Sequence, residues 1–210
     1  MMAGMIATSS QTNAQTTIGP SNIKLQSDLM TPEALWAMGR IGASTASPDG
    51  KQIVYQVTYY SVAQNKSHTI LYIQDINGKN KRQLTSDNKS ESDATWIESG
   101  RRIAFLRDGE IWAMSPDGNN RKQLSHTEVA IEGFSFSPDG KKVVYIKSIP
   151  YHGTIRETPS DLPKATGLLI TDMNYRHWDH YVQTIAHPFV ANITQEGIQE
   201  GKDIMQCQPF

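Results

Sequence analysis

The sequence lacks the features that would tie the chain to a membrane, a nucleic acid or a disulfide framework. Its single cysteine, Cys207, cannot form an intrachain disulfide. No apolar run approaches the roughly 20 residues of a membrane span. The formal net charge of −1 provides no bulk attraction for nucleic acid or for an anionic membrane. With 38% apolar and 20% charged residues, the 210-residue chain has an ordinary globular composition and can bury a core.

The clearest catalytic and ligand-binding motifs are also missing. The chain has no Gly-x-Ser-x-Gly nucleophile elbow, no Gly-x-x-x-x-Gly-Lys-Ser/Thr phosphate loop and no Gly-x-Gly-x-x-Gly loop. His177 and His180 are three residues apart, and His187 follows seven residues later. A zinc site needs three or four convergent ligands, and the sequence offers no convincing third ligand beside His177 and His180. We therefore assign no catalytic residue and no metal ligand.

What the sequence does contain is a repeated turn. Residues 47–51 and 137–141 are both Ser-Pro-Asp-Gly-Lys, and a degenerate copy spans Trp96–Phe105. The proline presets φ at the second turn position, the aspartate bonds nearby backbone, and the glycine tolerates a positive φ. Apolar β-branched and aromatic residues flank the turns, as is typical of strands. Each copy therefore predicts a β-hairpin.

A second element repeats in phase with the first. An apolar strand pattern, a turn ending in glycine, and then Gln-Leu-Thr or Gln-Leu-Ser occur at residues 71–85 and again at 111–125. Gly78 and Gly118 lie 40 residues apart. A period of about 40–45 residues with four short strands per unit indicates the blades of a β-propeller, as in WD40-like repeats.

The predicted fold is therefore all-β: a partial β-propeller of about three four-stranded blades, preceded by a short helix. The expected divisions are a leader remnant at 1–14, a lead-in at 15–42 with a helix at 32–38, and an incomplete propeller at 43–210 with blades at about 43–85, 93–125 and 131–193. The insertion between Gln56 and Ile70 is a longer loop or an extended hairpin. Three blades leave open edges, so we expect a piece of a larger protein that is weakly stable or self-associating, for example as a homodimer.

The helix has clear end signals in the sequence. Thr31 suits the N-cap, Pro32 the first helical position and Gly39 the position after the C-cap. Its apolar side would anchor the lead-in on the sheet through Leu35, Trp36 and Met38.

The first 23 residues carry no charged side chain. A short apolar start and a polar stretch ending at Ala14 resemble the back half of a secretory signal peptide, with cleavage after Ala14. The basic n-region is missing, and the alternative is an unstructured tail. On the signal-peptide interpretation, the protein is periplasmic or secreted.

Candidate substrate-binding residues lie in the irregular segment after the third hairpin. Arg176 could hold a carboxylate, Asp179 an amine and Trp178 an apolar group. Arg156 and Glu157 are further candidates of the same kind. The alternative is a packing cluster in which the arginine and aspartate pair with each other, because polar groups near a core are normally paired.

These motifs together resemble a known family. The Ser-Pro-Asp-Gly-Lys hairpins followed by Gln-Leu-Thr/Ser turns resemble the TolB-type propeller repeat. Residues 31–40 come before the first hairpin, and Asn-Tyr-Arg-His-Trp-Asp at 174–179 comes before His-Pro-Phe-Val at 187–190. This order is similar to the N-terminal propeller of bacterial prolyl-oligopeptidase-family serine peptidases of the dipeptidyl-peptidase and acylaminoacyl-peptidase branch. The likeness is strongest to the type 5 dipeptidyl peptidases and covers about residues 30–193.

The resemblance implies a two-domain enzyme that hydrolyses short peptides from their N-terminus without a metal or organic cofactor. The propeller would gate access to a C-terminal α/β-hydrolase domain with a Ser-Asp-His triad. That domain, the implied partner of these blades, is absent from this sequence, so we expect the chain alone to be inactive. The alternative is a non-enzymatic periplasmic propeller that binds a protein partner, as TolB-like proteins do.

Overall fold

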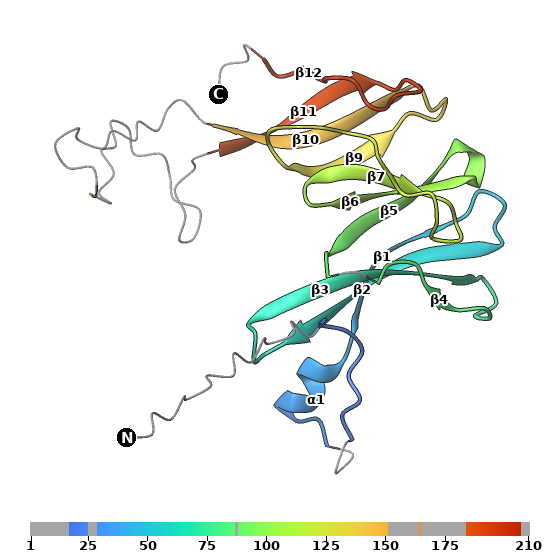
Figure 1. The fold of residues 1–210 in the computed structure, drawn as a ribbon, viewed down its shortest axis with the longest axis vertical. Helices are drawn as coiled ribbons and strands as arrows, with labels where there is room; N and C mark the ends of the chain where they lie inside the picture. The colour runs from blue at the N-terminus through green and yellow to red at the C-terminus, as the bar shows by residue number, and fades with distance from the viewer. Residues whose placement is uncertain (1–16, 25–28, 87, 151–163, 165–183, 207–210) are drawn as a thin grey trace, which may run out of the picture.

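Three four-stranded antiparallel sheets follow one another along the chain in the computed structural model (Figure 1). The structure describes residues 17–24, 29–86, 88–150, 164 and 184–206. The first sheet contains β1 (Arg40–Ala46), β2 (Gln52–Ser61), β3 (Lys66–Asp75) and β4 (Arg82–Gln83). The second contains β5 (Glu91–Ile97), β6 (Arg102–Arg107), β7 (Glu110–Met114) and β8 (Lys122–Gln123). The third contains β9 (Ile131–Phe136), β10 (Lys142–Pro150), β11 (Thr184–Asn192) and β12 (Lys202–Asp203).

Within each sheet the strands pair in chain order, so each sheet is an up-and-down blade. A short helix, α1 (Pro32–Ala37), precedes the first sheet, and a single 3₁₀ turn, η1 (Glu98–Gly100), joins β5 to β6. In Figure 1 the sheets succeed one another from the α1 end of the molecule to β12. The all-β, blade-by-blade architecture predicted from the repeat is confirmed.

The Ser-Pro-Asp-Gly turns form as the sequence predicts. Gly50 and Gly140 adopt φ values of +69° and +68°. In the first turn the Gly50 amide donates to the Ser47 carbonyl over 2.8 Å. The Asp49 carboxylate accepts from the Ser47 hydroxyl at 2.6 Å and from the Lys51 amide at 3.1 Å. The motif therefore closes its own hairpin with local hydrogen bonds and one left-handed glycine.

The Gln-Leu-Thr/Ser motif ties the outer edge of a blade to its third strand. The Thr85 hydroxyl accepts from the Leu71 amide at 3.0 Å, and the Ser125 hydroxyl accepts from the Ile111 amide at 2.8 Å. The motif's glutamine donates its side-chain amide to the carbonyl of the same Thr or Ser. The leucine between them is buried. A hydroxyl thus continues the hydrogen-bond ladder past the end of a two-residue strand.

Hydrophobic faces join consecutive sheets. The core between the first and second sheets consists of Val54, Leu71, Ile73, Leu84, Ile103, Phe105 and Met114. The core between the second and third consists of Leu106, Ile111, Ala113, Leu124, Ile131, Val143, Tyr145, Phe189 and Ala191. Backbone contacts reinforce both interfaces: the Leu84 carbonyl accepts from the Arg121 guanidinium at 2.8 Å, and the Leu124 carbonyl accepts from the Ile198 amide at 2.7 Å.

The far face of the third sheet is different. From the strand pairing, Ile204 follows β12 as Leu84 follows β4 and as Leu124 follows β8. Leu84 and Leu124 are 5% and 7% exposed, whereas Ile204 is 54% exposed. The burial of the motif's leucine therefore comes from the neighbouring blade, not from its own sheet, because no further sheet covers Ile204 within the described residues.

Two sequence expectations are refined by the strand pairing. The insertion in the first blade is an extended hairpin, since β2 and β3 pair without interruption from Gln52 opposite Asp75 to Ser61 opposite Lys66. The third blade was expected to end near residue 193, but its fourth strand, β12, lies further on. Two residues without an apolar pattern leave no periodic signal, and only their pairing with β11 identifies them as a strand.

The helix departs further from expectation. Thr31 caps it as predicted, accepting from the Ala34 amide at 3.2 Å, but Ala34 is its buried residue. The larger apolar side chains, Leu35, Trp36 and Met38, stay 41–46% exposed. The apolar side is therefore only partly buried on the sheet, where Trp36 contacts the Tyr60 ring of β2 edge to face. Gly39 does not adopt a positive φ. It is needed for another reason: a Cβ there would lie 2.6 Å from the Tyr59 ring.

We predict that Gly140→Ala lowers the free energy of unfolding by about 1–2 kcal/mol, because an L-residue is strained at φ +68°. Open space surrounds the position, so the cost is conformational and not steric. Urea unfolding followed by circular dichroism measures it. Gly133→Ala is the matched control, since Gly133 has open space without a left-handed φ. Equal stability of the two variants would contradict the prediction.

We also predict that Thr85→Val lowers the free energy of unfolding by about 1–3 kcal/mol, because it leaves the buried Leu71 amide without its hydroxyl acceptor. Thr85→Ser keeps the hydroxyl and reproduces the residue that the second blade uses at this position. We expect this control to retain most of the stability in the same urea titration. A Val variant as stable as the Ser variant would show that the hydroxyl contributes nothing.

Candidate functional site

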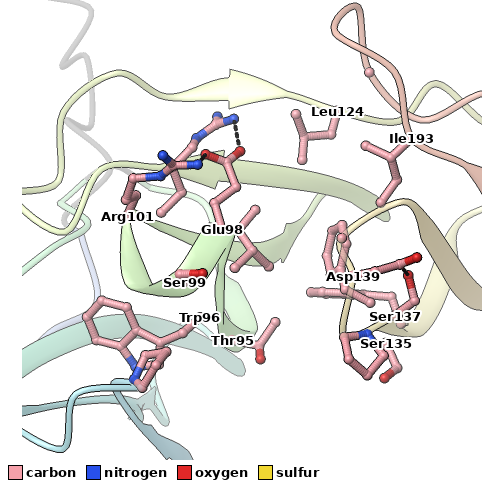
Figure 2. A pocket seen from close by; sticks show the side chains of 18 of the residues that line it. Thr95, Trp96, Glu98, Ser99, Arg101, Leu124, Ser135, Ser137, Asp139 and Ile193 are labelled. Carbon is pink, nitrogen blue, oxygen red and sulfur yellow. Dashed lines mark hydrogen bonds and ion pairs between the residues drawn. The ribbon is translucent and has the colours of Figure 1, made fainter.

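A cleft lies between the second and third sheets of the described structure. Figure 2 shows it from close by, and its volume is about 700 Å³. It lies at the end of the blades that carries the Ser-Pro-Asp-Gly turns, and both the β5–β6 and β9–β10 turns line it. In each blade two turns lie at this end: the turn from the first to the second strand and the turn from the third to the fourth strand. In the first blade these two turns are in contact, because the Ile76 amide donates to the Lys51 carbonyl at 2.8 Å.

Aromatic side chains from β5 and β9, the first strands of the second and third sheets, form one part of the cleft wall. The Trp96 indole donates to the Thr45 carbonyl at 3.2 Å, so it is anchored on the first sheet. Phe134 and Phe136 on β9 contact each other edge to face, with ring centroids 5.6 Å apart. Fixed aromatic faces of this kind suit stacking or apolar contact with a ligand.

Charged side chains at the rim are largely occupied by one another. Glu98 pairs with Arg102 at 3.4 Å and with Arg101 at 3.9 Å, both within or next to the η1 turn. Lys122 donates to the Gln195 carbonyl at 3.2 Å, across from the second sheet to the third. The described residues that line the cleft include serines but no histidine or cysteine. This arrangement can hold a polar and aromatic ligand, and none of the serines among these lining residues is paired with a histidine.

Asp139, in the β9–β10 turn, is the acidic group of the cleft with the clearest electrostatic signature. Its carboxylate accepts from the Ser137 hydroxyl at 2.6 Å and from the Lys141 amide at 3.0 Å. The Ser137 hydroxyl, followed by the Lys141 amide, lowers the pKa of the Asp139 carboxyl from its ordinary value of 3.8. Asp49 has the same two donors in the first blade, and its pKa is lowered in the same way. The shift therefore belongs to the turn motif and is not evidence of catalysis.

A buried ionic cluster lies in the second sheet, on its side facing the first. Glu91 at the start of β5 is almost fully buried, and its carboxylate pairs with Arg107 at 3.0 Å and with Arg121 at 3.7 Å. The Arg107 guanidinium also lies 5.4 Å from the centre of the Trp112 ring. A buried carboxylate requires such partners, so we interpret this cluster as part of blade-to-blade packing.

The predicted substrate-binding residues lie outside the described residues: Arg156, Glu157, Arg176, Trp178 and Asp179. The structure therefore describes where the connection that contains these residues leaves β10 and where it enters β11. Pro150 and Thr184 are paired across β10 and β11, at the end of the blade opposite the cleft. The candidates and the cleft therefore belong to connections at opposite ends of the third sheet.

His177 and His180 also lie outside the described residues, whereas His187 does not. The His187 ring lies 2.8 Å from the Asp203 carboxylate and ties β11 to β12. Within the described part of the chain, no three His, Cys, Asp or Glu side chains gather in a way that could hold a metal ion. The cysteine, Cys207, and the leader segment 1–14 fall outside this part as well.

Sequence reasoning did not identify the cleft. The signal that could have pointed to it is the departure of the second hairpin from its repeat, where Glu98-Ser99-Gly100-Arg101 stands in place of Ser-Pro-Asp-Gly. That departure supplies the Glu98–Arg101 and Glu98–Arg102 pairs at the rim. Whether the altered turn would border a cleft depended on how the second and third sheets pack.

The geometry defines a class of protein: three consecutive up-and-down blades are part of a β-propeller. The sequence comparison points to a particular family of propellers. Residues 47–148 match the family described as the dipeptidyl peptidase IV (DPP IV) N-terminal region. This match confirms, for these residues, the resemblance inferred from the motifs.

Relatives of known name agree with this assignment. The chain is 38% identical over 195 residues to dipeptidyl-peptidase 5 of Porphyromonas endodontalis, covering 91% of this chain and 28% of that protein. It is 38% identical over 185 residues to dipeptidyl-peptidase 5 of Porphyromonas gingivalis, covering 86% and 27%. The chain thus spans little more than a quarter of the length of these relatives.

The fold also resembles a solved structure. Acylaminoacyl peptidase of Pyrococcus horikoshii superimposes with a TM-score of 0.54 at 14% sequence identity, over 80% of this chain and 25% of that chain. At this identity the likeness concerns the fold alone.

We predict that Ser137→Ala raises the pKa of the Asp139 carboxyl toward 3.8, because the variant removes the donor that contributes most to lowering it. A carboxyl whose pKa is lowered by folding stabilises the fold above its unfolded value, and that stabilisation is lost as the pH falls below 3.8. Carbon-13 NMR titration of Asp139 in both proteins measures the shift. Asp49, whose Ser47 donor is untouched, is the internal control, and an unchanged Asp139 titration would contradict the prediction.

Proposed function

We propose that this chain forms the N-terminal part of the propeller of an exported serine peptidase that removes dipeptides from the N-terminus of short peptides. The observation that carries the proposal is 38% identity over 195 residues to a dipeptidyl-peptidase 5. The blade architecture supports it, since the described part of the chain is built of consecutive four-stranded sheets.

In this proposal the blades position the substrate and limit access, while chemistry takes place on a C-terminal α/β-hydrolase domain. There a serine attacks the scissile carbonyl, a histidine transfers the proton and an aspartate orients the histidine. A short peptide fits a propeller-gated enzyme because a folded protein cannot pass between the blades. No metal or organic cofactor takes part.

We further propose that the connection between β10 and β11 contacts the peptide. Arg176 would bind a carboxylate, Asp179 the peptide amine and Trp178 an apolar side chain, with Arg156 and Glu157 as secondary contacts. What supports this is the position of the connection. It leaves β10 at Pro150 and re-enters β11 at Thr184, at the end of the blades where the chain also enters β1.

The proposed location is the periplasm or the exterior of the cell. The uncharged stretch ending at Ala14 supports export. Within the described residues, no helix has the length and apolar character required to cross a bilayer.

Reading the gene beyond the codon for Phe210 tests the proposed function. We expect the frame to continue through further blades into a Gly-x-Ser-x-Gly motif, where the nucleophile of an α/β-hydrolase sits. A frame that closes the propeller and then stops would favour the alternative, a non-enzymatic propeller that binds a protein partner.

We predict that the 210-residue chain by itself releases no dipeptide, because its sequence has no Gly-x-Ser-x-Gly nucleophile elbow. The measurement is turnover of a chromogenic dipeptidyl substrate, with dipeptidyl-peptidase 5 of Porphyromonas endodontalis as the positive control. Turnover by the chain that a serine-directed inhibitor abolishes would overturn this prediction.

A further inference from the structure

An arginine at the start of the first blade is held against two aromatic rings. The Arg40 guanidinium lies 4.4 Å from the centre of the Tyr60 ring and 5.0 Å from the centre of the Trp36 ring. The two rings contact each other edge to face, with their centroids 5.5 Å apart. A guanidinium that stacks on aromatic rings is restricted in orientation, so its N–H donors are positioned before a ligand binds.

The fold brings these three side chains together from separate elements. Trp36 belongs to α1, which packs against β2 (Figure 1), whereas Arg40 is the first residue of β1 and Tyr60 lies near the end of β2. Arg40 is paired with Thr58, so its side chain is on the same face of the sheet as that of Tyr60, two residues further on. The cluster therefore exists only where the helix meets the edge of the first sheet.

The part of the first blade that departs from the repeat adds a second cation and a cavity. β2 has ten residues, whereas β6, its counterpart in the second blade, has six. The additional length of the β2–β3 hairpin carries Tyr60 on one strand and Lys66 on the other. A cavity of about 400 Å³ opens there, and its lining includes Trp36, Tyr60, Ser61, Val62 and Lys66. This volume is within the range of small-ligand sites, roughly 300–1,000 Å³.

The positive charge at this place is not compensated by the described part of the chain. Arg40 and Lys66 are both exposed. Among the residues that the structure describes, no Asp or Glu side chain pairs with either of them, including Glu33 in the first turn of α1. An anionic ligand could therefore reach both cations without displacing an acidic side chain of the blade.

The residue types at the site indicate the chemistry of the ligand. A guanidinium binds a carboxylate through two parallel N–H···O hydrogen bonds, which are stronger than those between neutral groups. An ammonium adds a point charge beside them. Two aromatic rings and the Val62 side chain offer apolar contact to an organic group attached to the carboxylate. A carboxylate carried by a peptide combines both features.

We propose that Arg40 and Lys66 form a binding site for a peptide carboxylate, with the residue that carries it packed against Trp36 and Tyr60. A C-terminal carboxylate and an acidic side chain share this chemistry, and the experiment below separates them. The site lies at the end of the blades from which the β10–β11 connection also leaves, because β2 ends and β3 begins there. Binding requires only residues of this chain, so it succeeds or fails independently of any peptidase activity.

An NMR titration of the 210-residue chain tests the site. The probe is N-acetyl-Ala-Phe with a free carboxylate, and its matched analogue is the C-terminal amide of the same peptide. The Trp36 indole signal and the Lys66 and Ser67 amide signals report binding. We expect the acid to shift these signals to saturation and the amide to bind about tenfold more weakly or worse, as for the loss of a charge-assisted hydrogen-bonded pair. A third probe, the amide of N-acetyl-Glu-Phe, carries only a side-chain carboxylate and so distinguishes the two sources.

Arg40→Gln should weaken binding of the acid about tenfold or more, because it removes the charged donors. Arg40→Lys keeps the charge without the planar fork and should bind with intermediate affinity. Arg82→Gln is the matched control, since it removes an exposed arginine from β4 at the other edge of the same sheet, and it should bind as the wild type. Unchanged amide signals of β6 and β7 show that each variant is folded.

Three results would each overturn the proposal. The first is that neither carboxylate probe binds more tightly than the amide. The second is that the folded Arg40→Gln variant binds the acid as tightly as the wild type. The third is that inorganic phosphate shifts the same signals with the affinity of the peptide acid, because the site would then attract anions without recognising a peptide.

Discussion

The packing of one sheet face on the next is the constraint on which the rest of the structure depends. A four-stranded blade cannot bury its apolar face by itself, so it needs a neighbour. The leucine of the Gln-Leu-Thr/Ser motif shows this directly, because Leu84 and Leu124 are buried by the following blade while Ile204, at the same position, is exposed. The backbone contact of each such leucine with the next blade fixes the spacing of the sheets.

Placing the turns at one end of the blades has consequences for function. Hairpin turns made of a few local hydrogen bonds leave the long connections to the opposite end, where the chain has room for an insertion between β10 and β11. The cleft lies at the turn end, where the β5–β6 turn, which departs from the repeat at η1, faces the regular β9–β10 turn. The sheets thus carry short turns at one end and the β10–β11 connection at the other.

Much of the fold could be predicted because its signals are local or periodic. The turn at Asp49-Gly50, the 40-residue period and the Thr31 cap all act within a few residues or repeat along the chain, and each was found where expected. The site was less accessible to prediction. Candidates such as Arg176 were chosen for side-chain chemistry in a segment without periodicity, and they lie outside the described residues. The cleft and the Glu91 cluster depend on contacts between sheets, which no short stretch of sequence encodes.

By itself the sequence determined the class of fold, the number of repeats and the family, because a repeated turn and a repeated strand pattern need no knowledge of neighbours. Only the tertiary structure decided which faces are buried. It showed that Gly39, directly after the C-cap of the helix, is packed closely against Tyr59 and does not adopt a positive φ. It also showed that His68 meets Ile18 and Lys89, residues 50 and 21 positions away. Such contacts depend on how strands twist and sheets stack, and they exist only once the blades are assembled.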